Sequence, residues 1–363
     1  MAASPPAMID AYTAHQIDLV RLAAGEAKKA DAFLIDLIDY LNARLAREGE
    51  TIRNKKRLTE LLADVKARQA ALLTGYMTDV LADMPEIVAQ ELEFNAETVS
   101  AVVQDYAPAV PTVEQAIVAV TRNPLLIGYQ GGAIDWQELT NGWIPDETKR
   151  VADRITAGFY TGEPTTQIAR AISGTKAAGY KDGLLNVTRA NAQAIAKTAI
   201  NHMATQTRAA FNEANSDLIV GEEVVATLDS RTSAYCRAAD GKVYLYKDGP
   251  FPRPPYHFAC RTTLSPVLSE EFDFTRAGRT RPAVADGQAR QVSASTTYYE
   301  WLKRQPAHVI DSALGKKQGL VFRNAGLSAE EFRQATVNQF GQPLSLAEMA
   351  DHNKQIAEYL RNL

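Results

Sequence analysis

The chain has little cysteine: only two of its 363 residues are Cys. Two thiols cannot build a disulfide framework, so a reducing cytosol is the expected place of synthesis. The chain also lacks the run of about 18 apolar residues that a membrane helix requires. Its first residues, "MAASPPAMIDAYTAHQ", show no basic segment followed by an apolar one. We therefore expect neither a membrane-spanning segment nor a signal peptide.

An excess of charge of one sign is also missing. The net charge is −4, which argues against a protein whose whole surface binds nucleic acid but allows a local basic surface. The hydrophobic content of 46% is ordinary for a globular protein. A length of 363 residues favours two or three structural units.

Common enzyme motifs are absent as well. The sequence contains no Walker A motif, no G-x-S-x-G, no H-E-x-x-H and no G-x-G-x-x-G. Paired acids occur in "EGE" at 48–50 and "ELE" at 91–93. Both pairs lie on polar helical segments, so we expect them on solvated helix faces. The chain is therefore not expected to be an enzyme.

Helical periodicity dominates what is present. Apolar side chains recur at helical spacing over residues 34–45 and again over 58–76, which predicts two long amphipathic helices. A helix is predicted from 188 to 215 with Thr188 as its N-cap, and Lys197, Asn201 and Arg208 lie near one face of it. That face is expected to form hydrogen bonds to a neighbouring module. Capping boxes predict helix starts at Thr112, Ser328 and Ser345.

After residue 215 the sequence pattern changes from helical periodicity to that of strands. "EEVVATLD" and "GKVYLYK" have the composition or alternation of strands. Between them, "DSRTSAYCRAADG" predicts a short helix that Asp229 or Thr232 caps and Gly241 ends. We thus predict a mainly α fold with a small α+β module. The expected regions are an N-terminal helical bundle or partner-binding region 1–110, a helical middle region 111–218, the α+β module 219–274, a linker or arm 275–296 and a C-terminal helical region 297–363.

The segment 275–296 lacks apolar periodicity and carries four arginines: Arg276, Arg279, Arg281 and Arg290. It is expected to be an extended surface arm. The arm would be either a solvated linker or a contact for nucleic acid or an acidic partner.

Both cysteines belong to a module that also contains a histidine near one of them. Cys236, His257 and Cys260 have C-x20-H-x2-C spacing, which offers three ligands to a metal such as zinc. Ser233 stands where a C-x-x-C pair would need its second thiol. Asp229 or Asp240 could complete the set, although oxygen is the less usual ligand in structural zinc sites.

Three other interpretations of these residues remain open. Cys260 and His257 could form a nucleophilic pair, although no oxyanion feature accompanies them. Cys236 and Cys260 could form a disulfide. The interpretation that we favour is a structural core in which both thiols are buried and His257 hydrogen-bonds to backbone or to an acid such as Asp229. No cofactor is then required, and zinc stays an alternative.

Taken together, "AIAKTAINHMATQTRAAFNEAN", "VVATLDSRTSAYCRAADGKVY" and "PPYHFACRT" resemble the Mu-F-like phage head morphogenesis (minor head protein) family. The strong resemblance covers about 188–267, and a weaker one extends from about 146 to about 340. The residues that match the family pattern are Thr198, Asp229, Arg231, Thr232, Cys236, Asp240, Gly241, Pro255, His257, Cys260 and Arg261.

The chain also departs from the family pattern. Lys197 replaces the usual arginine, and Ala199 stands where an acid often follows. Ser233 and Thr262 stand where many members carry further cysteines, which weakens the case for a metal.

The resemblance implies a non-enzymatic virion component, made in the host cytoplasm and present in few copies. Such proteins act in capsid assembly and associate with the portal protein at the vertex, and some assist DNA packaging or ejection. Other capsid or scaffolding proteins and packaged DNA are further implied partners. The competing hypothesis is a nuclease or ADP-ribosyltransferase effector in the C-terminal third, with His308, Lys316, Lys317 and Arg323 as its candidate residues. A lesser alternative is a zinc-stabilised adaptor.

Overall fold

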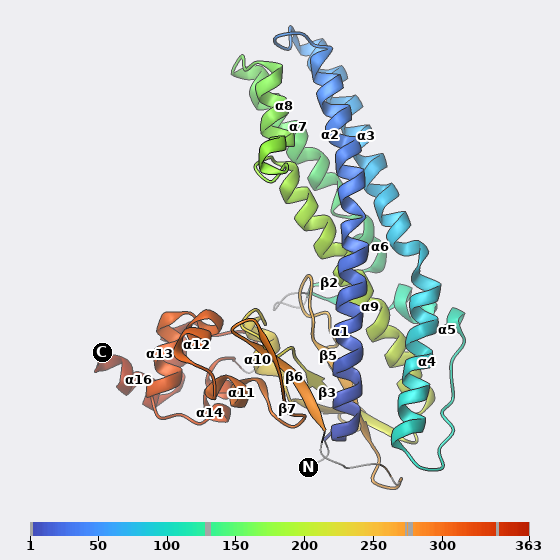
Figure 1. The fold of residues 1–363 in the computed structure, drawn as a ribbon, viewed down its shortest axis with the longest axis vertical. Coiled ribbons are helices and arrows are strands. Elements are labelled where there is room, and N and C mark those ends of the chain that lie inside the picture. Colours follow the sequence, from blue (N-terminus) through green and yellow to red (C-terminus); the bar gives the residue numbers. More distant parts are fainter. Residues whose placement is uncertain (1–2, 128–131, 273, 275–278, 339–340, 363) are drawn as a thin grey trace.

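The computed structural model describes residues 3–127, 132–272, 274, 279–338 and 341–362. Figure 1 shows a long helical stalk that rises from a base, with a C-terminal helical region beside that base. Helices dominate the described residues, and the strands form small sheets. The predicted class, mainly α with a small α+β module, is confirmed. Among the described residues, no helix is both long and apolar enough to cross a bilayer.

The stalk consists of helices that each bury an apolar stripe (Figure 1). Its members are α1 (Pro6–Lys28), which enters from the base, α2 (Ala30–Ala46), α3 (Lys55–Ala82), α7 (Ile144–Tyr160), α8 (Thr165–Ser173) and the first part of α9 (Leu185–Ala214). Leu34, Leu41, Leu61 and Ile155 are among the side chains that α2, α3 and α7 bury together. The predicted stripes of 34–45 and 58–76 therefore face the stalk interior.

The free end of the stalk is formed by the turn between α2 and α3 and by the start of α8. The Thr165 backbone N–H donates to the Glu50 carbonyl at 2.9 Å, and the Thr165 hydroxyl donates to the Gly49 carbonyl at 2.6 Å. Glu48 is buried and pairs with Arg44 at 2.5 Å and Arg57 at 3.0 Å. The pair of acids expected on a solvated face at 48–50 is thus partly buried, because two arginines compensate the Glu48 charge.

In the base, helices from the first 102 residues pack against the second part of α9. It contains α4 (Met84–Val102), α5 (Val113–Arg122), the strands β1 (Leu125–Leu126) and β2 (Ala133–Ile134), α6 (Trp136–Asn141) and the second part of α9. The short helix η1 (Lys176–Ala178), between α8 and α9, belongs to the stalk. Met8 of α1, Val88 of α4 and Phe211 of α9 share one core. The capping box predicted at Thr112 is present and opens α5.

Two predicted boundaries differ from the structure. The division at residues 110 and 111 is not a packing boundary, because the core just described joins α1 and α4 to α9. The helix α9 begins at Leu185, so Thr188 is not its N-cap. Thr188 lies inside the helix, buried, and its hydroxyl donates to Glu147 at 2.6 Å.

The α+β module contains a three-stranded antiparallel sheet with the order β4-β3-β5. Its elements are β3 (Ile219–Val225), α10 (Ala234–Ala239), β4 (Val243–Leu245), η2 (Tyr246–Asp248) and β5 (Thr263–Leu268). The strand–helix–strand order is present, and β5 is an addition. The sequence does not predict β5 because it contains Pro266, and proline is rare in strand interiors. The structure tolerates Pro266 because β5 is an edge strand. The N-cap of α10 is Ser233, rather than the predicted Asp229 or Thr232.

The expected extended arm is wrong for the described part of 275–296. Strands β6 (Thr280–Ala285) and β7 (Gln288–Ser293) form an antiparallel hairpin. Its turn contains Asp286 and Gly287 with φ of 52° and 71°. Asp-Gly is a favoured pair for such turns because both residues tolerate positive φ. Arg276 lies outside the described residues; Arg279 and Arg290 are exposed, whereas Arg281 is buried.

The C-terminal region has its own apolar core. Its helices are α11 (Tyr298–Lys303), α12 (Ala307–Leu314), α13 (Lys316–Asn324), α14 (Ala329–Ala335), α15 (Leu346–His352) and α16 (Lys354–Arg361). Tyr298, Trp301, Phe322 and Phe332 are buried together. The capping boxes predicted at Ser328 and Ser345 are both present.

Candidate functional site

The candidate site lies where a loop of the α+β module crosses α9. This loop, residues 249–262, connects η2 to β5, and we call it the strap. Asn201 of α9 donates its side-chain N–H to the Cys260 carbonyl at 2.8 Å. Thr198, one turn earlier, accepts from the Ala259 backbone N–H at 2.8 Å. The expected hydrogen-bonding face of this helix is therefore confirmed at Asn201, and its partner is the strap.

A second contact fixes the start of β5. Arg208 of α9 donates to the Thr263 hydroxyl at 2.5 Å and to the Leu264 carbonyl at 3.2 Å. The same guanidinium pairs with Glu91 of α4 at 2.6 Å, and both side chains are buried. Glu91 was expected on a solvated face, and that expectation is wrong. Arg208 compensates its charge, and His15 Nε2 lies 2.7 Å from its carboxylate.

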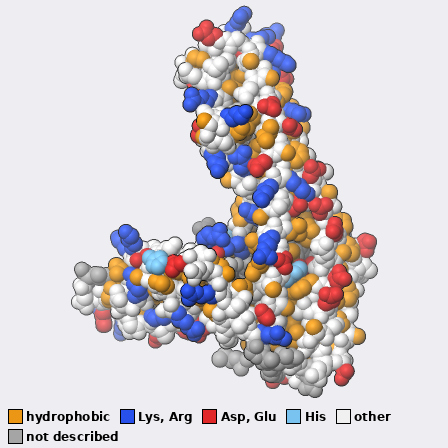
Figure 2. Space-filling view, in the orientation of Figure 1, with side chains coloured by type: hydrophobic (Ala, Val, Ile, Leu, Met, Phe, Trp, Pro, Cys, Tyr) orange, Lys and Arg blue, Asp and Glu red, His pale blue; other side chains and the backbone are white. Residues whose placement is uncertain are grey.

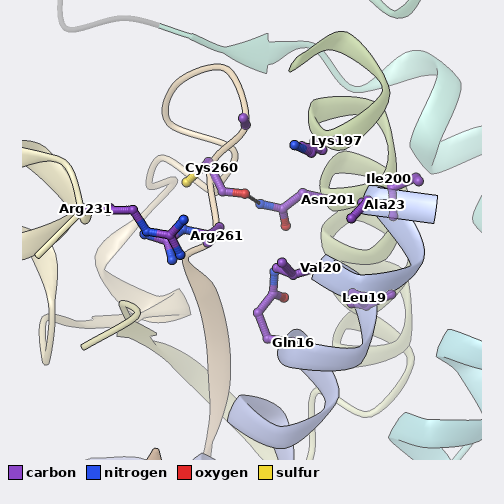
Figure 3. A pocket seen from close by; sticks show the side chains of 12 residues that line it. Gln16, Leu19, Val20, Ala23, Lys197, Ile200, Asn201, Arg231, Cys260 and Arg261 are labelled. Carbon is purple, nitrogen blue, oxygen red and sulfur yellow. Dashed lines mark hydrogen bonds between the residues drawn. The ribbon is translucent and has the colours of Figure 1, made fainter. Parts of the chain in front are cut away.

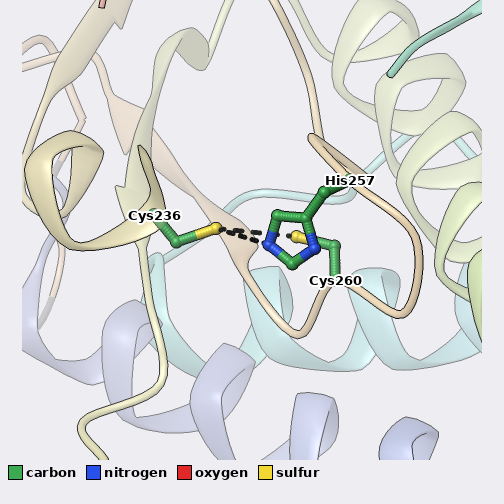
Figure 4. A group of neighbouring side chains, drawn as sticks. All are labelled: Cys236, His257 and Cys260. Carbon is green, nitrogen blue, oxygen red and sulfur yellow. Dashed lines mark hydrogen bonds between the residues drawn. The ribbon is translucent and has the colours of Figure 1, made fainter. Parts of the chain in front are cut away.

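The strap brings His257 and Cys260 against Cys236, which lies in α10 (Figure 4). The Cys236 and Cys260 sulfurs are 3.8 Å apart, and His257 Nε2 is 3.3 Å from the Cys236 sulfur. The three ligand atoms lie within 4.8 Å of one another. Both thiols are buried and His257 is half-buried. The packed core that we favoured and a three-ligand metal site are both compatible with this arrangement.

The three side chains influence one another's protonation. The hydrogen bond with Cys260, together with burial, raises the pKa of Cys236. Burial alone would raise the pKa of Cys260, but hydrogen bonds with Cys236 and His257 lower it. Burial opposes protonation of His257, yet its contact with Cys260 raises the pKa of the imidazole. Cys260 is therefore the first thiol of the pair to ionise, although it is only 3% exposed, which closes it to a substrate.

The two aspartates that could have joined these ligands are engaged elsewhere. Asp229 accepts both guanidinium N–H groups of Arg261, at 2.6 and 2.9 Å. Burial opposes ionisation of Asp229, but Arg261 and Thr232 lower its pKa. Asp240 is buried and pairs with Arg281 of β6 at 3.1 Å. Of the two partners expected for His257, the structure has the backbone: His257 Nδ1 lies 2.9 Å from the Phe258 carbonyl, and no described contact joins His257 to Asp229.

The remaining motif residues support the module. Arg231 is exposed, and Thr232 donates to the Thr227 carbonyl at 2.5 Å. Gly241 has a φ of +76° after α10, as its predicted role of helix terminator requires. Pro255 is buried in the strap.

Beside the strap lies a cleft of about 330 Å³ between α1, α9 and the motif loops (Figure 3). Its α1 wall is largely apolar, with Leu19 and Val20. Lys197 of α9 also lines the cleft, and Arg231 and Arg261 lie on the side opposite α1 (Figure 3). The sequence did not predict this cleft, because its two walls lie almost 200 residues apart in the chain.

Most of the residues that form this site lie in one segment of the chain that matches a protein family. Residues 149–265 match the family model described as "Phage Mu protein F like protein". The chain carries a Mu F-like region. No curated protein and no solved structure matches the chain.

The Mu F-like region runs from α7 into β5 and contains all of α9, α10 and the strap. The resemblance inferred from the motif residues is therefore confirmed. The match of this region to the family model indicates a relation to phage head proteins. The helices α1 to α4 precede the Mu F-like region and pack against its helices: α2 and α3 against α7 and α8, and α1 and α4 against α9. The ion pair between Arg208 and Glu91 joins α9 to α4.

The four candidate residues of a C-terminal effector do not converge. His308 is exposed and lies 2.5 Å from Asp286. Arg323 pairs with Asp311 at 2.5 Å. Lys316 and Lys317 are exposed at the start of α13. No described hydrogen bond or ion pair joins any two of these four residues, and His308 and Arg323 pair with different aspartates.

Proposed function

We propose that this chain is a bacteriophage minor head protein, a low-copy component of the virion that associates with the portal at the vertex. Its role would lie in capsid assembly, with DNA packaging or ejection as the process it serves, and it would be non-enzymatic. The observation that carries this proposal is the match of residues 149–265 to the Phage Mu protein F like family.

The stalk offers a surface for such a partner. Its free end carries five exposed cationic side chains and one exposed acid in the same turn, Glu50, whereas the acid Glu48 is buried there. These cations are Arg47, Arg53, Lys55, Lys56 and Arg57. Figure 2 shows Lys and Arg side chains at this end of the stalk. A cluster of this kind favours an acidic protein surface, and we propose that the portal supplies it.

The position of these cations supports a binding role. Lys55, Lys56 and Arg57 occupy the first turn of α3, which contains no acidic residue. The amino end of a helix carries a partial positive charge, so cations there oppose the helix dipole. Local stability alone would favour Asp or Glu at these positions. Arg57 also compensates the buried Glu48 charge, so Lys55 and Lys56 are the two cations that oppose the dipole without such a partner among the described ion pairs.

Two experiments test the proposal. Purified virions should contain the protein at few copies per particle by quantitative mass spectrometry, and virions without it would contradict the proposal. In addition, portal protein from the same phage should co-purify with the wild-type chain. The variant with Arg53→Glu, Lys55→Glu and Lys56→Glu should lose most of that co-purification.

The matched control reverses two exposed lysines far from the stalk, Lys316→Glu and Lys317→Glu in α13. It should retain portal binding. Equal loss in both variants would indicate non-specific charge attraction. Unchanged portal binding in the stalk variant would show that the free end is not part of the interface. The virion measurement would still test whether the chain is a minor head protein.

A further inference from the structure

We propose that Cys236, His257 and Cys260 bind a Zn²⁺ ion through two sulfurs and one imidazole nitrogen. This site goes beyond the proposed function and does not depend on it. It would make the strap a metal-closed loop that fixes the α+β module against α9.

All three ligand atoms lie within 4.8 Å of one another, and the two distances that involve the Cys236 sulfur fit a tetrahedral ion. With Zn–S near 2.3 Å and Zn–N near 2.0 Å, tetrahedral angles place two sulfurs about 3.8 Å apart and sulfur and nitrogen about 3.5 Å apart. The two sulfurs are 3.8 Å apart, and Cys236 Sγ and His257 Nε2 are 3.3 Å apart. A shared centre at bonding distance from all three atoms therefore requires little movement.

The imidazole is oriented as a ligand. His257 Nδ1 lies 2.9 Å from the Phe258 carbonyl, which can only accept, so Nδ1 carries the hydrogen. The lone pair of the neutral ring is then on Nε2, which points at the sulfurs (Figure 4). Metal-bound histidines commonly have such a carbonyl partner on the second ring nitrogen.

The backbone around both cysteines is held by other contacts. The Cys236 backbone N–H donates to the Ser233 hydroxyl at 3.3 Å in the first turn of α10. Asn201 holds the Cys260 carbonyl at 2.8 Å, and Thr198 holds the neighbouring Ala259 N–H at 2.8 Å. Two elements and α9 therefore fix the ligand positions without any ion, which lowers the ordering cost of binding.

The charge of the site also fits. Two thiolates neutralise one Zn²⁺, so an ion at this buried position would leave no net charge. Asp229 and Asp240 are held by Arg261 and Arg281 and are not needed for neutrality. The protein thus supplies three ligands, and a water molecule would complete the tetrahedron.

The fourth position can be tested with the chain's own residues. The Ser233 and Thr262 side chains are near enough to the Cys236 thiol to lower its pKa, against the larger effects of Cys260 and burial, which raise it. Thr262 is buried, and its side chain is close in size to cysteine. Thr262→Cys would therefore place a third sulfur beside the cluster and should tighten zinc binding.

The test uses the full chain, expressed with zinc and purified in a reductant. Elemental analysis should find one zinc per chain after gel filtration. Replacement by Co²⁺ should give a thiolate-to-metal charge-transfer band and the d–d spectrum of a tetrahedral site. His257→Ala and Cys236→Ser should each weaken Zn²⁺ affinity at least ~10-fold, because even substitutions outside the ligand shell cost ~10–100-fold. Thr262→Cys should strengthen it.

His308→Ala is the matched control, since His308 is exposed and distant from the cluster in the chain. It should retain one zinc per chain. Circular dichroism establishes that each variant is folded, and His257→Ala is the milder change because this side chain is half-buried.

Three results would overturn the proposal. The first is a folded wild-type chain without stoichiometric zinc and without a cobalt thiolate band. The second is unchanged zinc in folded His257→Ala and Cys236→Ser. The third is a mass lower by two hydrogens in the reductant-purified protein, which would identify a Cys236–Cys260 disulfide.

Discussion

Buried carboxylates paired with distant arginines link the segments of this chain. Glu91 meets Arg208 across 117 residues, and Asp240 meets Arg281 across 41. Asp229 meets Arg261 across 32. Removing one partner of a buried pair leaves an uncompensated charge, which costs far more than the pair contributes by being present. These pairs therefore enforce a specific arrangement of helices and strap.

Glu91→Gln should reduce the free energy of unfolding by about 3–5 kcal/mol at pH 7, because Arg208 would keep a buried charge without its counterion. Burial alone would raise the pKa of Glu91, but Arg208 and His15 lower it to about 2. An unfolded glutamate titrates near 4.3. The stabilisation is thus fully present above about pH 4.3 and is lost as the pH falls toward 2.

Urea unfolding at pH 7, 4 and 3 measures this difference. The gap between wild type and Glu91→Gln should narrow as the pH falls. Glu93→Gln, an exposed acid on the same helix, is the control and should change stability little at any of these pH values. A gap that stays constant from pH 7 to pH 3 would contradict the ion-pair explanation.

The sequence could not place these buried charges. "ELE" at 91–93 has the composition of a solvated helix face, and only the contact with Arg208 shows that Glu91 points inward. The cysteine cluster was more accessible to prediction, since His257 and Cys260 lie three residues apart and the motif names Cys236. What no pattern could supply is the distance between the two thiols, because it depends on how α10 packs against the strap.

At the scale of elements, local sequence signals predicted where helices begin better than which segments pair as strands. The capping boxes at Thr112, Ser328 and Ser345 each open a helix, since cap chemistry involves only four neighbouring residues. β5 was missed because Pro266 interrupts it. The β6–β7 hairpin was missed although Asp286-Gly287 is a strong turn signal, because its flanking strands lack clear alternation.

The first turn of α3 gives a prediction at this scale. Lys55→Glu with Lys56→Glu should raise the free energy of unfolding by roughly 0.3–1 kcal/mol per residue, because acids complement the positive end of the helix dipole. Thermal unfolding at low salt measures the gain. Lys66→Glu, exposed near the middle of the same helix, should give no comparable gain. A loss of stability in the double variant would show that the lysines make contacts that outweigh the dipole.

At the scale of the whole molecule, the Mu F-like region connects all other parts. α9 receives α1, α4 and α5 on its surface, and its Asn201 holds the strap. The core of the C-terminal region also includes Leu228 of the module and Ala283 of β6. Polar contacts join the two parts as well. Asp240 accepts from Arg281, and also from the Tyr298 backbone N–H at 2.7 Å.

Asp240→Asn should therefore loosen the C-terminal region without unfolding the stalk. Limited proteolysis should cut the variant faster between β5 and α11, and the far-ultraviolet circular dichroism should stay helical. Asp248→Asn, an exposed aspartate in the same module, is the control and should be cut at the wild-type rate. Equal cleavage of Asp240→Asn and wild type would show that the apolar contacts alone hold this region.

Because α9 is one continuous helix, it fixes the rotation of its stalk end relative to its base end. Thr188 is fixed to Glu147 in the stalk, and Asn201 is fixed to Cys260 in the base. One extra residue between them would turn one end by about 100° against the other and shift it by about 1.5 Å. No single rotation could then satisfy both bonds. Insertions of seven residues, close to two full turns, would nearly restore the phase and lengthen the stalk by roughly 10 Å. The stalk can therefore change length only by insertions close to a whole number of helical turns. The lengths of α3 and of the α1–α2 pair must change by the same amount.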